Sequence, residues 1–172
     1  MDIRQATPQD AQGIAQTHVA TWQFAYRGQL PDAFLDSLSI EKRVQTWQKI
    51  LSNPSSGSAV WVAEAQGDIL GFCAVGPSQD ADATPETGHL YAIYVDPNQI
   101  GQGLGSQLMA RGLETLKAQG FKEATLWVLD TNEKTRKFYE SRGWSEDGAK
   151  KTEPGEGFVF NETRYRISLT GQ

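Results

Sequence analysis

The sequence predicts a single α/β domain with a mixed, mostly antiparallel sheet of about seven strands flanked by about four helices. Two strand-like segments in the middle of the chain are joined by a tight turn, which is typical of an antiparallel hairpin. A strand–helix–strand crossover follows, and such a crossover joins parallel strands. No Pro-, Gly- or Ser-rich linker divides the 172 residues. We therefore expect one domain, 1–172, rather than two.

The first half of the chain predicts one short strand and two helices. The strand covers 3–6, and Thr7 and Pro8 then suit the cap and the first position of a helix. Bulky and apolar residues at a spacing of three and four extend this helix toward Gly28. A second helix begins after Ser39 and ends where Pro and Gly break the pattern.

From residue 59 onward the pattern changes to that of a sheet. Segments 59–63 and 69–75 form the predicted hairpin around Gln66-Gly67-Asp68. Another strand, 90–95, is stopped by Asp96-Pro97, and a leucine-rich helix begins at Leu104 and is closed by Gly120. The remaining predicted elements are a strand over 124–129, a short helix over 133–141 and extended segments over 144–151 and 158–169.

Composition narrows the classes of function. Lys and Arg number 16 against 21 Asp and Glu, and the net charge of −5 argues against nucleic acid as a partner. Cys73 is the only cysteine, and its apolar neighbours favour a buried structural thiol over a nucleophile. No segment approaches the roughly 18 apolar residues that span a bilayer, and the N-terminus lacks an apolar targeting core. We expect no membrane partner and a cytoplasmic location.

The most informative segment joins the strand 90–95 to the leucine-rich helix. Gly101, Gly103 and Gly105 occupy alternate positions just where the helix begins. Glycine allows a positive φ and a close approach of ligand to backbone, and a helix start offers unpaired N–H groups. We therefore expect an anion at this place, and a pyrophosphate suits it.

Three alternatives compete with that interpretation. A Walker loop needs Gly-Lys-Ser or Gly-Lys-Thr, whereas this chain has Gly105-Ser106 without lysine. A dinucleotide fingerprint needs glycine where Ser106 stands, and Asp130 alone offers the acidic residue after the next strand. A turn without ligand is disfavoured because each glycine costs roughly 0.5–1 kcal/mol relative to Ala in a helix.

Two signatures in residues 89–144 resemble the GNAT superfamily of acyl-CoA-dependent N-acetyltransferases. The first is 93–97 followed by the glycine loop 101–105, and the second is Asn132, Phe138-Tyr139-Glu140 and Gly143-Trp144. The order of elements extends the likeness over nearly the whole chain. The resemblance implies a GNAT-like fold and the transfer of an acetyl group from acetyl-CoA, a cosubstrate, to a primary amine of a small molecule without a metal ion.

The chain departs from the family pattern at two positions. Ile100 stands where members usually carry Arg or Gln beside the pyrophosphate. Trp127 stands where members that acetylate protein N-termini carry a glutamate base, so that subclass is not favoured. A second function remains open, that of a non-catalytic sensor or scaffold module that binds acyl-CoA.

The resemblance also implies roles for individual residues. The strand residues Ile93, Tyr94 and Val95 would pair with the pantetheine arm, and a backbone amide, that of Val95, would polarise the thioester carbonyl. Asn132 would hydrogen-bond the same arm, and Tyr139 would be the general acid that protonates the coenzyme sulfur, unless it packs beside Phe138 in the core. The pyrophosphate would be held by the amides of Gly101, Gln102, Gly103, Leu104, Gly105 and Ser106.

The general base and the acceptor are less determined. His89 is the candidate base because an imidazole titrates near neutral pH, with Glu86, Tyr91 and water as rivals, whereas His18 lies on a helix face typical of a core histidine. Trp22, Phe24 and Tyr26 line an acceptor pocket or fill the core. Acidic loops favour a cationic acceptor unless they are simply solvated, and they carry Asp32, Asp36, Asp80, Asp82 and Glu86. An exposed strand near 158–169 would allow a homodimer.

Overall fold

The computed structural model describes residues 1–155 and 157–170. The strands are β1 (Asp2–Gln5), β2 (Ala59–Ala65), β3 (Asp68–Pro77), β4 (Thr87–Val95), β5 (Glu123–Leu129), β6 (Ser145–Pro154) and β7 (Val159–Ser168). The helices are α1 (Ala11–Ala25), α2 (Asp32–Asp36), α3 (Ile40–Ser52), α4 (Leu104–Ala118) and α5 (Glu133–Ser141), with 3₁₀ turns η1 (Pro8–Asp10) and η2 (Pro97–Gln99). None of the helices in these ranges has the length and apolar character needed to cross a bilayer.

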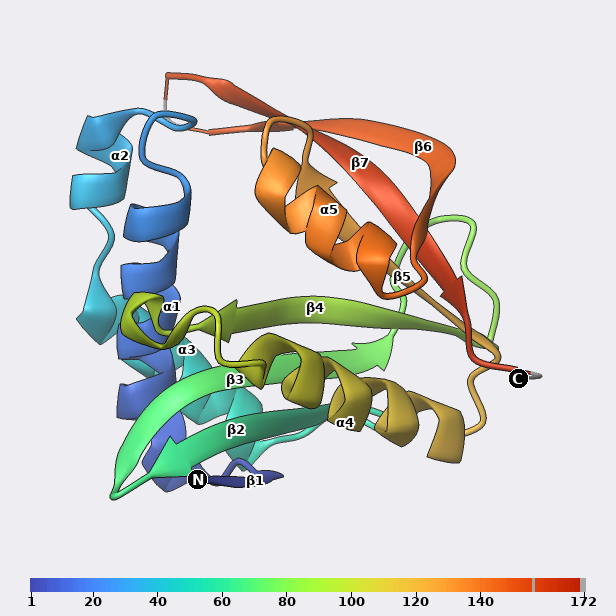
Figure 1. Cartoon of the computed structure of the whole chain (residues 1–172), viewed down its shortest axis with the longest axis horizontal. Coiled ribbons are helices and arrows are strands. Elements are labelled where there is room, and N and C mark those ends of the chain that lie inside the picture. The colour runs from blue at the N-terminus through green and yellow to red at the C-terminus, as the bar shows by residue number, and fades with distance from the viewer. Residues whose placement is uncertain (156, 171–172) are drawn as a thin grey trace.

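The seven strands form one sheet in the order β1-β2-β3-β4-β5-β7-β6. Every neighbouring pair is antiparallel except β4 and β5, which run parallel because α4 connects them. The predicted fold class, a mixed and mostly antiparallel sheet, is confirmed (Figure 1).

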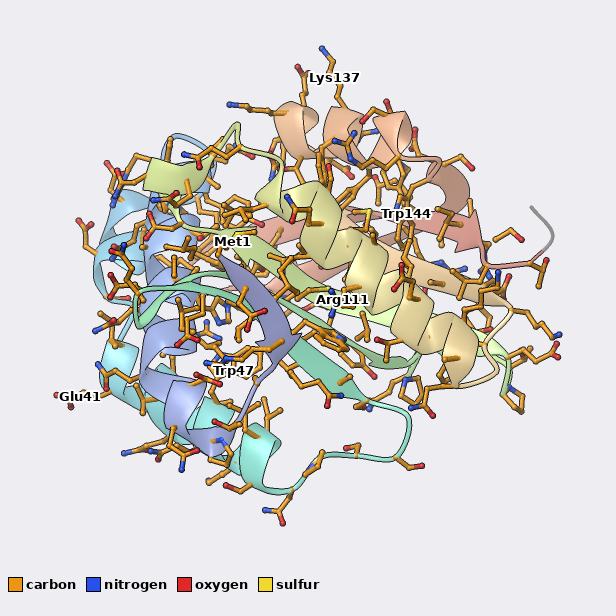
Figure 2. All side chains as sticks on the ribbon, turned by 60° about the horizontal axis from the view of Figure 1, so that its bottom comes forward. Met1, Glu41, Trp47, Arg111, Lys137 and Trp144 are labelled. Carbon is orange, nitrogen blue, oxygen red and sulfur yellow. The ribbon has the colours of Figure 1, made fainter. Side chains whose placement is uncertain are left out.

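Helices cover both faces of this sheet (Figure 1). Leucines of α4 and Tyr139 of α5 pack with Val75 and Leu126 on one face. On the other face, Ile14 of α1 and Trp47 of α3 pack against Phe72. Figure 2 shows Trp47 and Trp144 turned into the molecule, whereas Lys137 stands out from α5 into solvent.

Local sequence signals explain most element boundaries. The Ser39 side chain accepts a hydrogen bond from the Lys42 amide at 3.2 Å and so caps α3, as predicted. The β2–β3 hairpin turns at Gln66 and Gly67, whose φ values of 54° and 87° match a two-residue type I′ turn. Gly120, with φ of 97°, follows the last turn of α4.

The structure differs from the expected elements in three respects. The helix α2 was not predicted, because a single turn of five residues carries no periodic pattern. The strand β6 continues to Pro154, beyond the predicted 151. The segment 158–169 is not an exposed edge, since β7 pairs with β5 on one side and β6 on the other, and this removes the basis for the suggested homodimer.

The feature that matters most for the site is the parting of β4 from β5. Their ladder contains only the pairs Thr87–Glu123, Gly88–Ala124 and His89–Thr125. Beyond these pairs β4 continues with β3, whereas β5 continues with β7 as far as Leu129. In Figure 1 the two strands start close together at the right and diverge toward the left. The second half of β4 therefore has one free edge.

Close packing of α4 on β3 fixes the start of that helix relative to the sheet. A Cβ on Gly112 would lie 2.8 Å from the Cys73 Sγ and 3.0 Å from a Val75 methyl. Burial raises the pKa of the Cys73 thiol to about 12, so this cysteine is the structural thiol that the sequence predicts.

We predict that Gly112→Ala lowers the free energy of unfolding by about 1–3 kcal/mol, because overpacking outweighs the gain of about 1 kcal/mol in helix propensity. In a Cys73→Ala background the same change should cost clearly less, since the closest clashing atom is gone. Urea denaturation of the four proteins measures both effects. Equal costs in the two backgrounds would show that Cys73 does not set the distance between α4 and β3.

Candidate active site

A cleft of about 1260 Å³ opens where β4 and β5 part. We call it the central cleft. Its loop half is lined by the glycine loop, the first turn of α4 and α5, and its β7 half by the end of α1 and by the strands β5, β6 and β7. Residues from both signatures therefore meet in one cavity, including Ile93, Tyr94, Val95, Gly101, Gly103, Leu104, Gly105, Ser106, Asn132 and Tyr139. Gln102, the remaining cofactor candidate, does not line it.

The glycine loop presents unpaired amides at the mouth of the loop half. Gly101 and Gly103 adopt φ values of 90° and 80°, which side-chain-bearing residues rarely do. The first helical bond of α4 runs from the Gln107 amide to the Gly103 carbonyl at 3.1 Å. Among the described residues, no acceptor takes a hydrogen bond of normal geometry from the six amides of 101–106. This is the arrangement that binds anions at helix starts.

The free edge of β4 supplies further backbone donors. The Asp96 amide donates to Leu70 of β3 at 2.8 Å. Because N–H groups alternate along a strand, the Val95 and Ile93 amides point the other way, into the cleft. The Thr21 hydroxyl of α1 donates to the Val95 carbonyl at 3.3 Å. This hydrogen bond does not involve the Val95 N–H, which stays available to a ligand.

The side chain of Tyr94 does not share this role. It points to α1, where its ring stacks on His18 at 5.2 Å between centroids and its hydroxyl accepts a hydrogen bond from Trp22 at 3.0 Å. The Tyr94 backbone N–H and carbonyl face β3, as those of Asp96 do, so Tyr94 offers neither its side chain nor its backbone groups to a ligand on the loop side, and the expected pairing of Tyr94 with the pantetheine arm is not supported.

Arg142 is a cleft residue that the sequence analysis missed. Its Nε donates to the Ser106 Oγ at 2.6 Å, and its guanidinium lies 4.7 Å from the centre of the Phe138 ring. A positive charge thus stands at the glycine loop although Ile100 replaces the usual Arg or Gln. The sequence offered one signal: Arg142 follows Tyr139 by three residues, the spacing of one helix face.

Asn132 and Tyr139 lie where α5 borders the cleft. The Asn132 side chain caps α5 by accepting a hydrogen bond from the Thr135 amide at 3.4 Å. Tyr139 packs against Phe138, Trp144 and Tyr165. It also lines the cleft, so it is at once a core residue and a residue that a ligand can reach. Its hydroxyl has no hydrogen-bond partner in the described part of the chain. Burial raises the pKa of Tyr139 above its usual range. The phenol therefore keeps its proton at neutral pH.

His89 also lines the cleft, from the last residue pair before β4 and β5 part. Its Nδ1 shares a hydrogen bond of 2.7 Å with the Thr125 hydroxyl. Burial lowers the pKa of His89 to about 4, with Lys151 and Arg164 adding to the shift and Asp80 opposing it. The imidazole is therefore neutral at pH 7.

The rival bases are less well placed. Glu86 is exposed and lies outside the central cleft, beside Lys122 and Arg166. Tyr91 lines the cleft, but its hydroxyl donates to the Pro77 carbonyl. His18 accepts a hydrogen bond from Trp47 at 3.2 Å and is buried in the core, which confirms its structural interpretation.

The expected acidic rim is wrong as a feature of the cleft. Asp32 and Asp36 pair with Arg27 at 3.4 and 3.0 Å on the surface. Asp80 and Asp82 pair with Arg164 at 3.1 and 2.7 Å. Neither these four carboxylates nor Glu86 line the cavity. The charged residues that do line its β7 half are Lys151, Glu153 and Glu162.

Aromatic side chains form much of the wall of the β7 half. Trp22 and Tyr26 line it and also pack against Leu30 and Phe160 at its floor, whereas Phe24 is 53% exposed at its rim. Trp22 and Tyr26 therefore do both things that the sequence left open: they line the pocket and they fill the core.

Comparison with known proteins agrees with this geometry. Residues 19–144 match the model of the Acetyltransferase (GNAT) family. An uncharacterized N-acetyltransferase of Bacillus subtilis (strain 168) is 32% identical over 131 residues, which cover 76% of this chain and 72% of that protein. A probable N-acetyltransferase of Mycobacterium tuberculosis is 29% identical over 166 residues, or 96% and 92% of the two chains.

Solved structures show the same fold. The PaiA N-acetyltransferase of Thermoplasma acidophilum, crystallised with coenzyme A, superposes with a TM-score of 0.79 at 17% identity, covering 97% of this chain and 98% of that one. A putative acetyltransferase of Salmonella typhimurium, crystallised with acetyl-CoA, gives 0.74 at 19% identity, with coverages of 100% and 95%.

We predict that neither histidine titrates near its ordinary pKa of 6.5, because burial holds the pKa of both His18 and His89 at about 4. Proton NMR of the imidazole signals against pH measures this, with His89→Gln to assign them. Between pH 6.5 and 4 the unfolded chain holds more protons than the native one, so stability falls as pH falls through that window. A His89 signal with a midpoint above 6 would contradict the assignment.

Proposed function

Because the chain belongs to the acetyltransferase (GNAT) family, we propose that it transfers the acetyl group of acetyl-CoA to the primary amine of a small molecule. The observation that carries the proposal is the set of unpaired amides at the glycine loop, which opens into the same cleft as Tyr139. The glycine loop suits a pyrophosphate, and the rest of the cleft has room for the thioester and the amine.

Acetyl-CoA fits the loop half in three respects. The amides of 101–106 and the guanidinium of Arg142 offer donors and positive charge for the pyrophosphate. The free edge of β4 offers the Ile93 amide to a carbonyl of the pantetheine arm, as in strand addition. Asn132 adds a side-chain partner at the start of α5. The Val95 amide is then placed to polarise the thioester carbonyl.

Two side chains handle the protons of the reaction. Attack by a neutral amine forms the C–N bond and breaks the C–S bond, so the leaving thiolate needs a proton. Tyr139 is the donor, since burial keeps its phenol protonated and its hydroxyl is uncommitted. His89 passes on the proton that the amine loses, directly or through water: its imidazole is neutral at pH 7, and because burial holds its pKa at about 4 it releases that proton to solvent rather than keeping it.

We predict that Gly103→Ala weakens CoA binding at least tenfold. A side chain at φ of 80° costs about 1–2 kcal/mol and turns the neighbouring amides away from the anion. Isothermal titration calorimetry with CoA measures the dissociation constant. Gly120→Ala is the matched control, because it places the same strain at the opposite end of α4, with φ of 97° and no atom within 4 Å.

Equal weakening in both variants would point to a general loss of structure rather than to the loop. If the intact, folded protein gave no heat with CoA at millimolar concentration, the proposed function would fail.

We predict that Tyr139→Phe lowers kcat at least tenfold while the dissociation constant for acetyl-CoA stays nearly unchanged. The ring keeps its packing, and only the proton donor is lost. The assay follows release of free thiol from acetyl-CoA over a panel of primary amines. Tyr91→Phe should change kcat less than threefold, because the Tyr91 hydroxyl is already bonded to Pro77. An unaltered rate in Tyr139→Phe would remove this residue from the mechanism.

The same assay separates the enzyme from the alternative function. Thiol release that depends on an amine supports acetyl transfer. Tight CoA binding without thiol release from any amine would favour a non-catalytic acyl-CoA-binding module.

A further inference from the structure

The β7 half of the central cleft contains a carboxylate that the proposed chemistry does not use. Side chains alternate along β7, so Phe160, Glu162 and Arg164 share one face, while Thr163 and Tyr165 face α5. Glu162 lies opposite Leu129 of β5 and Lys151 of β6. It is therefore held on the floor of the β7 half by a paired strand on each side.

The positive charges near Glu162 are already committed to other carboxylates. Arg164 pairs with Asp80, Asp82 and Asp147. Lys151 lies 2.9 Å from the Glu153 carboxylate and 4.4 Å from the centre of the Trp127 ring.

Glu162 itself has only one long ion pair among the described residues. Its nearest cation is Lys151 at 3.9 Å, which is beyond hydrogen-bond distance, and no described residue donates a hydrogen bond to its carboxylate. The side chain is only 18% exposed. A carboxylate so enclosed and so poorly paired costs free energy unless a ligand supplies the missing donors.

The pKa of Glu162 also reflects its burial and its lack of close cations. Burial raises the pKa of Glu162, with Glu153 and Asp130 adding to the shift and Lys151 opposing it. Burial raises the pKa of Tyr26 and of Tyr94 across the cleft, and the charge of Glu162 adds to both shifts. Glu162 thus acts on groups of α1 and β4, on the far side of the cavity from its own strand.

Much of the remaining wall of this half is apolar, although Gln29 and Thr131 also line the cleft. Trp22, Tyr26 and Leu30 line it from the α1 side, and Trp127 and Phe160 line it from the sheet. A ligand that fills this space needs one cationic group and an apolar body.

We propose that Glu162 binds the ammonium group of the acceptor, and that the acceptor is a primary amine on an apolar body without an acidic group beside the amine. This inference rests on the proposed function for the identity of the ligand as the acceptor. A carboxylate next to the amine, as in an amino acid, would lie against Glu162 and Glu153 and be repelled. The net negative charge of the floor thus selects amines over amino acids.

Phenethylamine and phenylalanine form a matched pair of probes, because they differ only in the carboxylate beside the amine. Calorimetry at pH 7 measures the dissociation constant of each, with no need for turnover. We expect wild-type protein to bind phenethylamine at least tenfold more tightly than phenylalanine. Glu162→Gln should weaken phenethylamine at least tenfold and reduce the preference, while leaving CoA binding unchanged.

The control is Glu146→Gln, which removes one negative charge from β6 where the carboxylate pairs with Arg136 and Lys150 outside the cleft. It should change neither dissociation constant more than twofold. Equal binding of phenethylamine by wild type and Glu162→Gln would overturn the inference, as would wild-type protein that binds phenylalanine as tightly as phenethylamine. If wild-type protein did not bind CoA, the proposed function would fail instead. The amine measurements would still test Glu162, because they need no CoA.

Discussion

The structure depends above all on the short parallel contact between β4 and β5. Three residue pairs join them, and then each strand follows its other partner. A longer ladder would pair the Ile93 and Val95 amides with β5 and fill the cleft that Tyr139 and Glu162 line. Because β4 is paired with β3 and β5 with β7 throughout, the parting costs few backbone hydrogen bonds beyond those of one free edge.

The cleft stays open because side chains hold its two walls apart. Tyr139 packs against Trp144, whose indole N–H donates to the Met109 sulfur of α4 at 3.4 Å. The α5 helix is thereby fixed to α4, which Gly112 lets approach β3 closely. On the other side, α1 anchors β4 through Thr21 and the Trp22–Tyr94 hydrogen bond. The geometry of the site is therefore a consequence of helix packing on both faces of the sheet.

Local signals allowed much of this to be predicted from the sequence. The Ser39 cap, the Gln66-Gly67 turn and the glycine loop 101–105 each report on a few neighbouring residues, and the structure has them as expected. Long-range pairing carries no such signal. The aspartates of the β3–β4 loop look like a free acidic rim until Arg164, more than 80 residues later, neutralises them. Glu162 was missed for the same reason, since only the strand order shows that its face of β7 borders the cleft.

The charge in the cleft depends on which acidic and basic side chains form ion pairs with each other. The chain carries a net charge of −5, yet most of the acidic groups near the site are matched by arginine or lysine. Several charged residues of the cleft lining lack a close partner of opposite sign in the described chain; they include Arg142 at the glycine loop and Glu162 on the opposite floor, whose nearest cation is Lys151 at 3.9 Å. A cleft that is positive where a phosphate binds and negative where an ammonium binds orients two substrates of opposite charge toward the same point. In the proposed reaction that point lies between the free amide of Val95 and the hydroxyl of Tyr139. Ile100, which stands where Arg or Gln was expected, adds no charge to the glycine loop, but Arg142 at the end of α5 supplies a cation there.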